Sequence, residues 1–264
     1  MPLTRVIGLM PAAGQATRLG PLPMSKELFP LGIQAGTGPK VACHSLLTAM
    51  RQAEITEALV ILRPGKWDIP AYLGDGALLD MRLGYLTVHV PFGVPFSLNQ
   101  AYPFVREATV ALGFPDILFQ PQEAYTKLLA RQAAGGADVV LGLFPTDQPE
   151  KVGVVEFDKA GRVAAILEKS QRTDLKYMWA IAVWQPSFTE FLHQFIEAEL
   201  KQLIGSTVPQ TLKQFPSYSE IPIGDVIQAA IGAGLRVEAE VFPTGRYLDI
   251  GTPDNLKKAV SGNF

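Results

Sequence analysis

The sequence predicts an α/β fold with a Rossmann-like central sheet, mixed but mostly parallel, that is flanked by helices. Short apolar runs typical of buried strands recur along the chain, and helical patterns separate many of them. Two runs on either side of Asp158-Lys159-Ala160-Gly161 indicate a hairpin, which adds a small antiparallel insert. We expect this insert over the rim of the sheet that carries the active site, within a single domain spanning residues 1–264.

The first elements form a βαβ unit. An apolar strand over 5–10 leads into a loop, an amphipathic helix follows over 41–54, and a second apolar strand covers 57–62. This order implies parallel pairing through a right-handed crossover. Further strands are expected over 85–90, 109–112, 137–144, 153–157, 162–168, 177–184 and 236–242, and helices over 98–108, 122–134, 188–203, 223–233 and 254–260.

The composition is that of an ordinary globular protein. Of 264 residues, 48% are hydrophobic and 18% are charged, and the 23 Lys and Arg residues are spread along a chain of net charge −2. This distribution gives no sign of a nucleic-acid or membrane surface, and no uncharged apolar run approaches the ~18 residues of a membrane span. Cys43 is the single cysteine, so no internal disulfide can form, and the N-terminal residues lack a signal-peptide pattern. We expect a cytoplasmic protein with no nucleic-acid or membrane partner.

The chain shows no internal repeat, and it has no hexapeptide repeat of the kind that builds a β-helix tail. The apolar faces of the helical segments 191–200 and 227–231 are expected in the core. Either face would also suit a subunit contact, so the sequence leaves a homo-oligomer open.

The stretch from Gly8 to Gly32 carries the first candidate site. After the first strand the chain turns through the small residues Ala12-Ala13-Gly14-Gln15 and then offers two separate cations, Arg18 and Lys26. Small residues let the backbone approach a ligand closely, and their N–H groups can point at phosphate. The pattern is neither a Walker A nor a GxGxxG sequence, and a turn packed on the sheet explains the small residues about as well. With its two cations, we expect this loop to hold a nucleotide triphosphate.

Three further features join this loop. Asp116 follows the strand at 109–112, Glu168-Lys169 close a strand of the hairpin, and Asp249 lies between two apolar residues. Each alone is typical of a turn, a solvated hairpin end or a helix cap. Together they supply two carboxylates for Mg²⁺ and, with the loop, three cations for phosphate oxygens. Phosphoryl and nucleotidyl transfer depend mainly on such positioning and charge neutralisation.

Four motifs in the same order resemble the sugar-1-phosphate nucleotidylyltransferases, of the glucose-1-phosphate thymidylyl- and uridylyltransferase kind. They are the loop PAAGQATRLGPLPMSKELFPLG, the strand-end Asp116, the Gly153 strand with Leu167-Glu168-Lys169, and the segment Tyr247-Leu248-Asp249-Ile250-Gly251-Thr252-Pro253. The resemblance covers nearly the whole chain. It implies that residues 1–144 bind the nucleotide, that residues 145–264 bind the sugar phosphate, and that a sugar-1-phosphate oxygen attacks the α-phosphorus of an NTP.

The resemblance also implies a role for each matching residue. Ala12, Ala13 and Gly14, with the neighbouring Gln15, would hold the base and the phosphates, and Arg18 would stabilise the leaving pyrophosphate. Lys26 would bridge the α-phosphate and the sugar phosphate. Asp116 and Asp249 would hold Mg²⁺, Lys169 would bind the sugar phosphate, and Glu168 and Gly153 would contact sugar hydroxyls.

The chain departs from the family pattern at three places. Gly113-Phe114-Pro115-Asp116 replaces a Gly-Asp pair, and Gln15-Ala16 replaces a glycine-containing pair. The base-reading segment is replaced by PFGVPFSLNQAYPF, in which Ser97 and Gln100 are the candidates for base contacts. UTP or dTTP and glucose 1-phosphate are the favoured substrates. The alternatives are a non-catalytic nucleotide- or sugar-phosphate-binding homologue, a cytidylyltransferase or a nucleotide-sugar glycosyltransferase.

Overall fold

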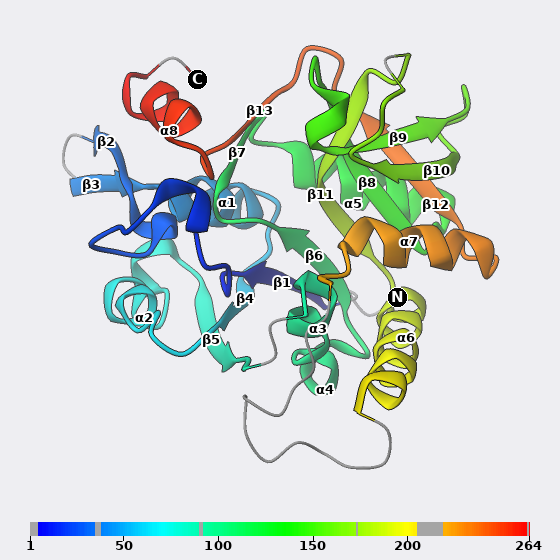
Figure 1. Ribbon diagram of the computed structural model, residues 1–264, viewed down its shortest axis with the longest axis horizontal. Coiled ribbons are helices and arrows are strands. Elements are labelled where there is room, and N and C mark those ends of the chain that lie inside the picture. Colours follow the sequence, from blue (N-terminus) through cyan, green and yellow to red (C-terminus); the bar gives the residue numbers. More distant parts are fainter. Residues whose placement is uncertain (1–4, 35–37, 90–91, 173, 205–218, 263) are drawn as a thin grey trace.

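A mixed sheet forms the centre of the protein, as predicted. The structure is a computed structural model that describes residues 5–34, 38–89, 92–172, 174–204, 219–262 and 264. Its largest sheet runs in the order β12-β8-β11-β6-β1-β4-β5, with β9 and β10 continuing beside β11 (Figure 1). The strands are β1 (Val6–Pro11), β4 (Glu57–Leu62), β5 (Arg82–Thr87), β6 (Thr109–Gly113), β8 (Val139–Pro145), β9 (Gly153–Phe157), β10 (Val163–Glu168), β11 (Tyr177–Trp184) and β12 (Val237–Val241).

The parallel strands place the loops that follow them along one edge of the main sheet. Strand β1 pairs in parallel with β4 and β6, and β4 pairs in parallel with β5. Strand β11 is antiparallel to both β6 and β8, which makes the sheet mixed. The carboxyl ends of β6, β1, β4 and β5 therefore lie along the same edge, where ligands of open α/β sheets bind.

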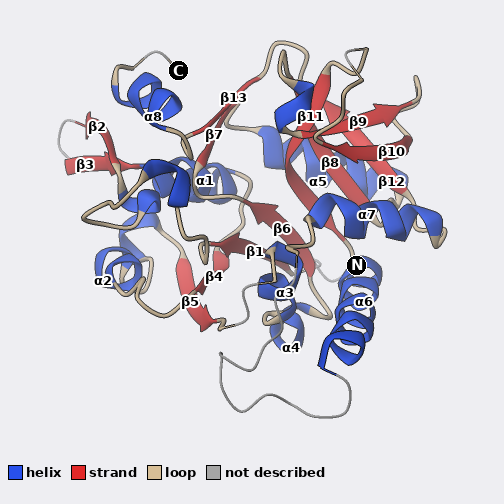
Figure 2. Cartoon of the chain, viewed as in Figure 1, coloured by secondary structure: helices blue, strands red, loops and turns tan. Residues whose placement is uncertain are grey.

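Helices cover both faces of this sheet (Figure 2). Side chains of α1 (Ala42–Gln52), α2 (Asp68–Leu73) and α5 (Ala124–Gly135) pack in one apolar cluster. Side chains of α3 (Val94–Asn99), α4 (Tyr102–Val105), α6 (Pro186–Ile204) and α7 (Ile223–Gly232) pack in a second cluster on the other face. Within the described residues, no helix combines the length and the apolar character needed to cross a membrane.

Two small antiparallel sheets and a final helix lie beside the main sheet. The sheets pair β2 (Pro30–Gln34) with β3 (Gly38–Val41) and β7 (Ile117–Gln120) with β13 (Arg246–Asp249). Helix α8 (Pro253–Val260) begins after Thr252, whose hydroxyl accepts a hydrogen bond from the Asn255 N–H at 3.4 Å. Four 3₁₀ turns complete the described elements: Thr17–Leu19, Lys26–Leu28, Ala77–Leu79 and Pro149–Lys151.

Some predicted boundaries are wrong. The strand expected over 85–90 occupies 82–87, where Arg82 pairs in register with Glu57 and also forms an ion pair with it. The helix expected over 98–108 is two short helices, α3 and α4, and α3 begins four residues earlier. Strands β2, β3, β7 and β13 were not predicted, because each has only four or five residues and little apolar alternation.

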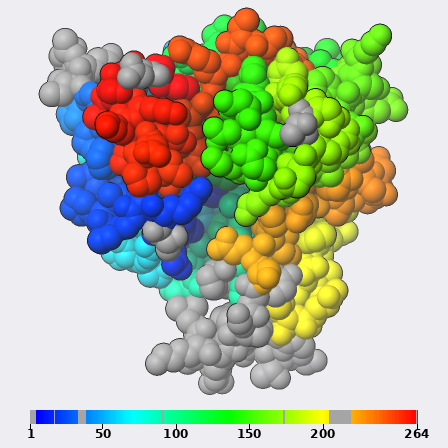
Figure 3. Space-filling model, turned by 45° about the horizontal axis from the view of Figure 1, so that its top comes forward, coloured from blue at the N-terminus to red at the C-terminus, as the bar shows by residue number. Residues whose placement is uncertain are grey.

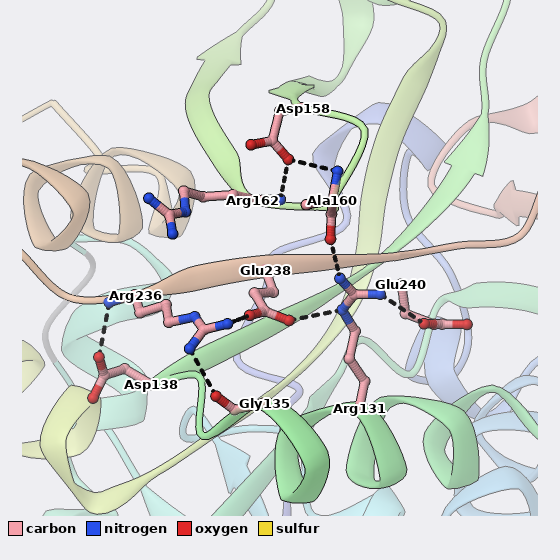
Figure 4. A network of polar contacts seen from close by, with 9 residues as sticks. All are labelled: Arg131, Gly135, Asp138, Asp158, Ala160, Arg162, Arg236, Glu238 and Glu240. Carbon is pink, nitrogen blue, oxygen red and sulfur yellow. Dashed lines mark hydrogen bonds and ion pairs between the residues drawn. The ribbon is translucent and has the colours of Figure 1, made fainter.

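A polar network fixes the hairpin of β9 and β10 to the edge strand β12 (Figure 4). Glu238 of β12 has 7% of its side chain exposed and is paired with Arg131 of α5, at 2.9 Å, and with Arg236. Arg131 also donates to the Ala160 carbonyl in the hairpin turn at 2.7 Å. The Ala239 N–H donates to the Gly161 carbonyl at 2.8 Å, so the turn covers the edge strand.

Replacing Arg131 with methionine is expected to destabilise the protein. The change removes one charged partner of a buried carboxylate, which costs about 2 kcal/mol of unfolding free energy. Urea unfolding followed by circular dichroism would measure this cost. Arg162→Met, at an exposed side chain in the same hairpin, is the matched control and should change the free energy of unfolding by less than about 0.5 kcal/mol. Equal effects of the two variants would contradict the proposed importance of the network.

Candidate active site

A pocket of about 550 Å³ lies at the carboxyl edge of the parallel strands. Its walls come from the loops after β1, β4, β5 and β6, together with the start of α3 and Glu220. In Figure 3 the surface is hollowed where the blue N-terminal segment faces the green and orange segments of the later chain. The lining residues are Pro11, Ala13, Gly14, Gln15, Arg18, Lys26, Glu27, Arg63, Pro64, Val88, His89, Gly93, Val94, Ser97, Phe114, Asp116 and Glu220.

The loop of small residues forms one wall of this pocket. Ala13, Gly14 and Gln15 line it, and a Cβ added at Gly14 would meet no atom within 4 Å, so a ligand can approach this backbone. Ala12 differs, because it is buried and its N–H donates to the Ile61 carbonyl at 2.8 Å. The structure therefore places Ala12 beneath the loop, with its N–H engaged by the neighbouring strand.

Lys26 and Asp116 meet inside the pocket. Lys26 lies in the 3₁₀ turn Lys26–Leu28, Asp116 follows β6, and the ammonium forms a hydrogen-bonded ion pair with Oδ2 of Asp116. Only 12% and 16% of the two side chains are exposed. Burial alone lowers the pKa of Lys26, but the Asp116 carboxylate, with smaller contributions from Glu27 and Asp249, outweighs it and raises the pKa above its usual value. Lys26 is thus a fixed positive charge.

The pairing of β7 with β13 brings Asp249 beside Asp116. Asp249 lies opposite Ile117 in this ribbon, and the Ile250 N–H donates to the Asp116 carbonyl at 2.9 Å. Its Oδ1 accepts the Gly251 N–H at 2.7 Å, and its Oδ2 lies 3.6 Å from Nη2 of Arg18. Burial, and then the nearby Asp116 charge, raise the pKa of Asp249. Two aspartates from distant segments therefore lie close together, although Asp116 lines the pocket and Asp249 does not.

The residues predicted to bind the sugar phosphate, Gly153, Glu168 and Lys169, form a second group. Glu168 lies opposite Gly153 in the pairing of β10 with β9, and Lys169 follows with a φ of 50° while its N–H donates to the Val152 carbonyl at 3.0 Å. A Cβ added at Gly153 would lie 2.7 Å from Oε1 of Glu168 and 3.0 Å from Nε1 of Trp179. The absence of a side chain at Gly153 therefore leaves room for both groups.

Burial, and then the Asp225 charge, raise the pKa of Glu168. Neither Glu168, Gly153 nor Lys169 lines the 550 Å³ pocket. Gly153 lies next to Trp179, and Trp179 connects these three residues to the pocket. The ring centroid of Trp179 lies 6.1 Å from that of the pocket residue Phe114. Phe114 belongs to the longer loop between β6 and Asp116, so this departure from the family pattern supplies a pocket wall.

Of the two residues predicted to contact the base, one lies in the pocket and the other does not. Ser97 is buried in α3 and lines the pocket, whereas Gln100 is exposed at the end of α3 and does not line it. The sequence reasoning also missed Glu27 and Arg63, which both line the pocket. Arg63 directly follows β4, so the rule that places ligands at strand ends could have found it.

The donor set near the pocket fits a divalent cation bound through two carboxylates and ligand oxygens. Within the described residues, no group of three or more His, Cys, Asp or Glu side chains gathers as a metal site. Asp116 and Asp249 do lie near each other, because the charge of Asp116, after burial, contributes to the raised pKa of Asp249. Mg²⁺ in sites that bind phosphates is commonly held by one or two carboxylates and by phosphate oxygens.

The fold and the pocket define a class: an α/β protein whose pocket at the carboxyl edge of its parallel strands is lined by a loop of small residues and by the cations Arg18, Lys26 and Arg63. The family comparison then identifies the family. The model of the nucleotidyl transferase family matches residues 7–262, so the chain belongs to the nucleotidyl transferases. This finding confirms the family resemblance read from the four motifs.

Individual relatives agree with this membership. A glucose-1-phosphate thymidylyltransferase from Neisseria gonorrhoeae is 28% identical over 261 residues, covering 96% of this chain and 81% of the relative. The nucleotidyltransferase Agl11 of low-salt glycan biosynthesis in Haloferax volcanii is 23% identical over 258 residues, 96% of this chain and 64% of the relative. A Bacillus anthracis structure, provisionally assigned as a glucose-1-phosphate thymidylyltransferase and solved with sucrose, superposes with a TM-score of 0.77 at 19% identity over 97% of this chain and 94% of that one. This last likeness shows the shared fold.

Proposed function

We propose that this protein transfers a nucleotidyl group from an NTP to a sugar 1-phosphate and releases pyrophosphate. UTP or dTTP is the favoured nucleotide, and glucose 1-phosphate is the favoured acceptor. The observation that carries the proposal is the meeting of Lys26, Asp116, Asp249 and Arg18 beside a backbone loop that a ligand can approach. Relatives named as glucose-1-phosphate thymidylyltransferases support the choice of substrates.

Each residue then has a chemical task. Backbone N–H groups of the loop at Ala13 and Gly14 bind phosphate oxygens, and Arg18 neutralises the charge of the departing pyrophosphate. Lys26 exchanges its carboxylate partner Asp116 for oxygens of the α-phosphate and the sugar phosphate, where negative charge builds up during attack. No general base is needed, because a phosphate dianion is already an adequate nucleophile.

Asp116 and Asp249 would hold Mg²⁺ in this reaction. When bound, the ion neutralises phosphate charge and orients the reacting groups. Glu168, Gly153 and Lys169 would bind the sugar 1-phosphate from the side of the hairpin. Residues 1–144 would accordingly serve as the nucleotide half of a single domain, and residues 145–264 as the sugar-phosphate half.

The direct test is pyrophosphate release from ATP, CTP, GTP, UTP and dTTP, each with several sugar 1-phosphates and Mg²⁺. We expect turnover with UTP or dTTP and glucose 1-phosphate. Turnover with CTP alone would favour the cytidylyltransferase alternative. Measurable NTP binding without turnover of any pair would contradict the proposal and favour a non-catalytic homologue.

Gly153→Ala is expected to weaken binding of the sugar phosphate selectively. The added Cβ would lie 2.7 Å from the Glu168 carboxylate and 3.0 Å from the Trp179 indole nitrogen, so at least one of them must shift. We expect the KM for the sugar 1-phosphate to rise about tenfold, equivalent to about 1.4 kcal/mol, with little change in the KM for the NTP. Steady-state kinetics with each substrate varied in turn would measure both.

The matched control is Gly232→Ala, because a Cβ added at that helix position meets no atom within 4 Å. It should leave both KM values unchanged. A rise in the KM for the NTP in Gly153→Ala, with the KM for the sugar phosphate unaltered, would contradict the assignment of the hairpin to the sugar.

A further inference from the structure

One loop holds the two residues on either side of Lys26. On one side, the carboxylate of Asp68 accepts the Ser25 N–H at 2.6 Å and the Ser25 hydroxyl at 2.8 Å. On the other side, Nζ of Lys66 donates to Oε1 of Glu27 at 2.7 Å. Residues 66–68 therefore fix Ser25 and Glu27 by three hydrogen bonds, and Lys26 lies between these two anchored neighbours.

The bond between Lys66 and Glu27 is buried. Only 5% and 1% of the two side chains are exposed, and Oε2 of Glu27 has no hydrogen-bond partner among the described residues. A buried ion pair gains little net stability over apolar residues of similar volume, because both charges must be desolvated. Its presence at this position therefore calls for a role other than stability.

The loop is itself attached firmly to the sheet. It follows a short turn after β4 and ends at Asp68, the first residue of α2, and Ile69, the next residue, is fully buried in the apolar core. The Lys66 N–H donates to the Arg63 carbonyl at 3.3 Å, and the Ile69 N–H donates to the Lys66 carbonyl at 3.4 Å. A rigid support of this kind can fix the backbone of Lys26 relative to the strand edge.

The positive charge of Lys66 also affects which carboxylate pairs with Lys26. Glu27 is the immediate neighbour of Lys26 and interacts with it electrostatically. With one oxygen of Glu27 bound to Lys66, the ammonium of Lys26 is directed to Asp116 instead. Without Lys66, Glu27 would be an unpaired buried carboxylate and would compete with Asp116 for Lys26.

We propose that Lys66 and Asp68 are positioning residues, which hold the Lys26 ammonium beside Asp116 and so at the reacting phosphates. The part that concerns the reacting phosphates rests on the proposed nucleotidyl transfer. The geometric part, that the loop 66–68 holds Lys26 in place, is independent of the reaction. Neither residue contacts the substrates in this proposal, since both act through Ser25 and Glu27.

The kinetic test uses Lys66→Met, Asp68→Ala and the conservative Lys66→Arg in the full chain. A displacement of a catalytic group by about 1 Å costs on the order of 100-fold in rate. We expect kcat per folded enzyme to fall at least about tenfold in Lys66→Met and Asp68→Ala, with the KM for the NTP within about threefold of the native value. Lys66→Arg should retain kcat within about threefold, because it keeps the charge and donates to Glu27.

A second readout needs no activity. Lys26 is mostly buried and paired with Asp116, so a water-soluble acetylating ester should modify it slowly at a fixed pH compared with the exposed Lys159. In Asp68→Ala we expect acetylation of Lys26, followed by peptide mass spectrometry, to accelerate at least about threefold relative to Lys159. This measurement remains decisive if no NTP and sugar phosphate turn over, so failure of the proposed function and failure of the positioning role are distinguishable.

The control for a general loss of stability is Thr189→Val, which removes a buried hydrogen bond of 2.9 Å from the Trp184 indole N–H to the Thr189 hydroxyl, at residues that do not line the pocket. It should leave kcat per folded enzyme and Lys26 acetylation unchanged. Unchanged kcat in both Lys66→Met and Asp68→Ala would overturn the proposal, and so would unchanged acetylation of Lys26 in Asp68→Ala. An equal loss of kcat in Thr189→Val would also overturn it.

Discussion

Asp116→Asn is expected to lower the rate of nucleotidyl transfer about 10³-fold while the protein stays folded. The substitution removes the carboxylate that pairs with Lys26 and that, with Asp249, would hold Mg²⁺. Asparagine has nearly the same shape and can still accept a hydrogen bond from Lys26, so little packing is lost. Pyrophosphate release measures the rate, and a thermal melt followed by circular dichroism measures folding.

Asp147→Asn is a suitable control, because Asp147 is an exposed aspartate shortly after β8 and does not line the pocket. It should keep the native rate within about twofold. If Asp116→Asn also kept a near-native rate, Asp116 would not be a metal ligand and the proposed mechanism would be wrong.

Asp249→Asn is expected to change activity and stability in opposite directions. Burial, and then the neighbouring Asp116 charge, raise the pKa of Asp249, so its ionised form is unfavourable in the folded protein. Removing the charge should raise the melting temperature by about 2 °C at neutral pH, a modest gain because the side chain remains 36% exposed. The same change should lower the rate at least about 100-fold, because one of the two acidic ligands is lost.

The pH dependence of this effect has a definite sign. A carboxyl group with a raised pKa in the folded state contributes stability below its unfolded pKa of about 3.8, and it loses that contribution as the pH rises through the folded value. The stability advantage of Asp249→Asn should therefore be present at neutral pH and disappear below about pH 4. Melting temperatures of both proteins between pH 3 and 8 would test this. A variant less stable than the native protein at pH 7 would show that ionised Asp249 stabilises the fold.

Much of the site could be predicted because its residues lie within short local motifs. Arg18 and Lys26 lie in the segment between β1 and β2, and Asp116 follows β6. The strand-end rule therefore assigns all three to one edge of the sheet on the order of strands and loops alone. Asp249 stands out by its place between two apolar residues, and the family resemblance adds its assignment as the second metal ligand. Its approach to Asp116 depends on two four-residue strands with little sequence signal.

Register and side-chain pairing could not be predicted. Whether the N–H of Ala12 faces a ligand or the carbonyl of Ile61 depends on where the pairing of β1 with β4 ends. Gln100 lies just after the end of α3, where its side chain is exposed and does not line the pocket. The pairing of Lys66 with Glu27 joins segments 39 residues apart, and no local pattern marks either partner.

The ribbon of β7 and β13 also bears on the order in which the protein folds. It joins residues more than a hundred positions apart, such as Ile117 and Asp249, through a few short-range contacts. Closing so long a loop costs entropy before those contacts repay it, so such pairings form late. After dilution from denaturant, the helices and the nearby pairing of β4 with β5 should recover first, and the carboxylate pair should assemble late. Regain of enzymatic activity would then lag behind regain of secondary structure.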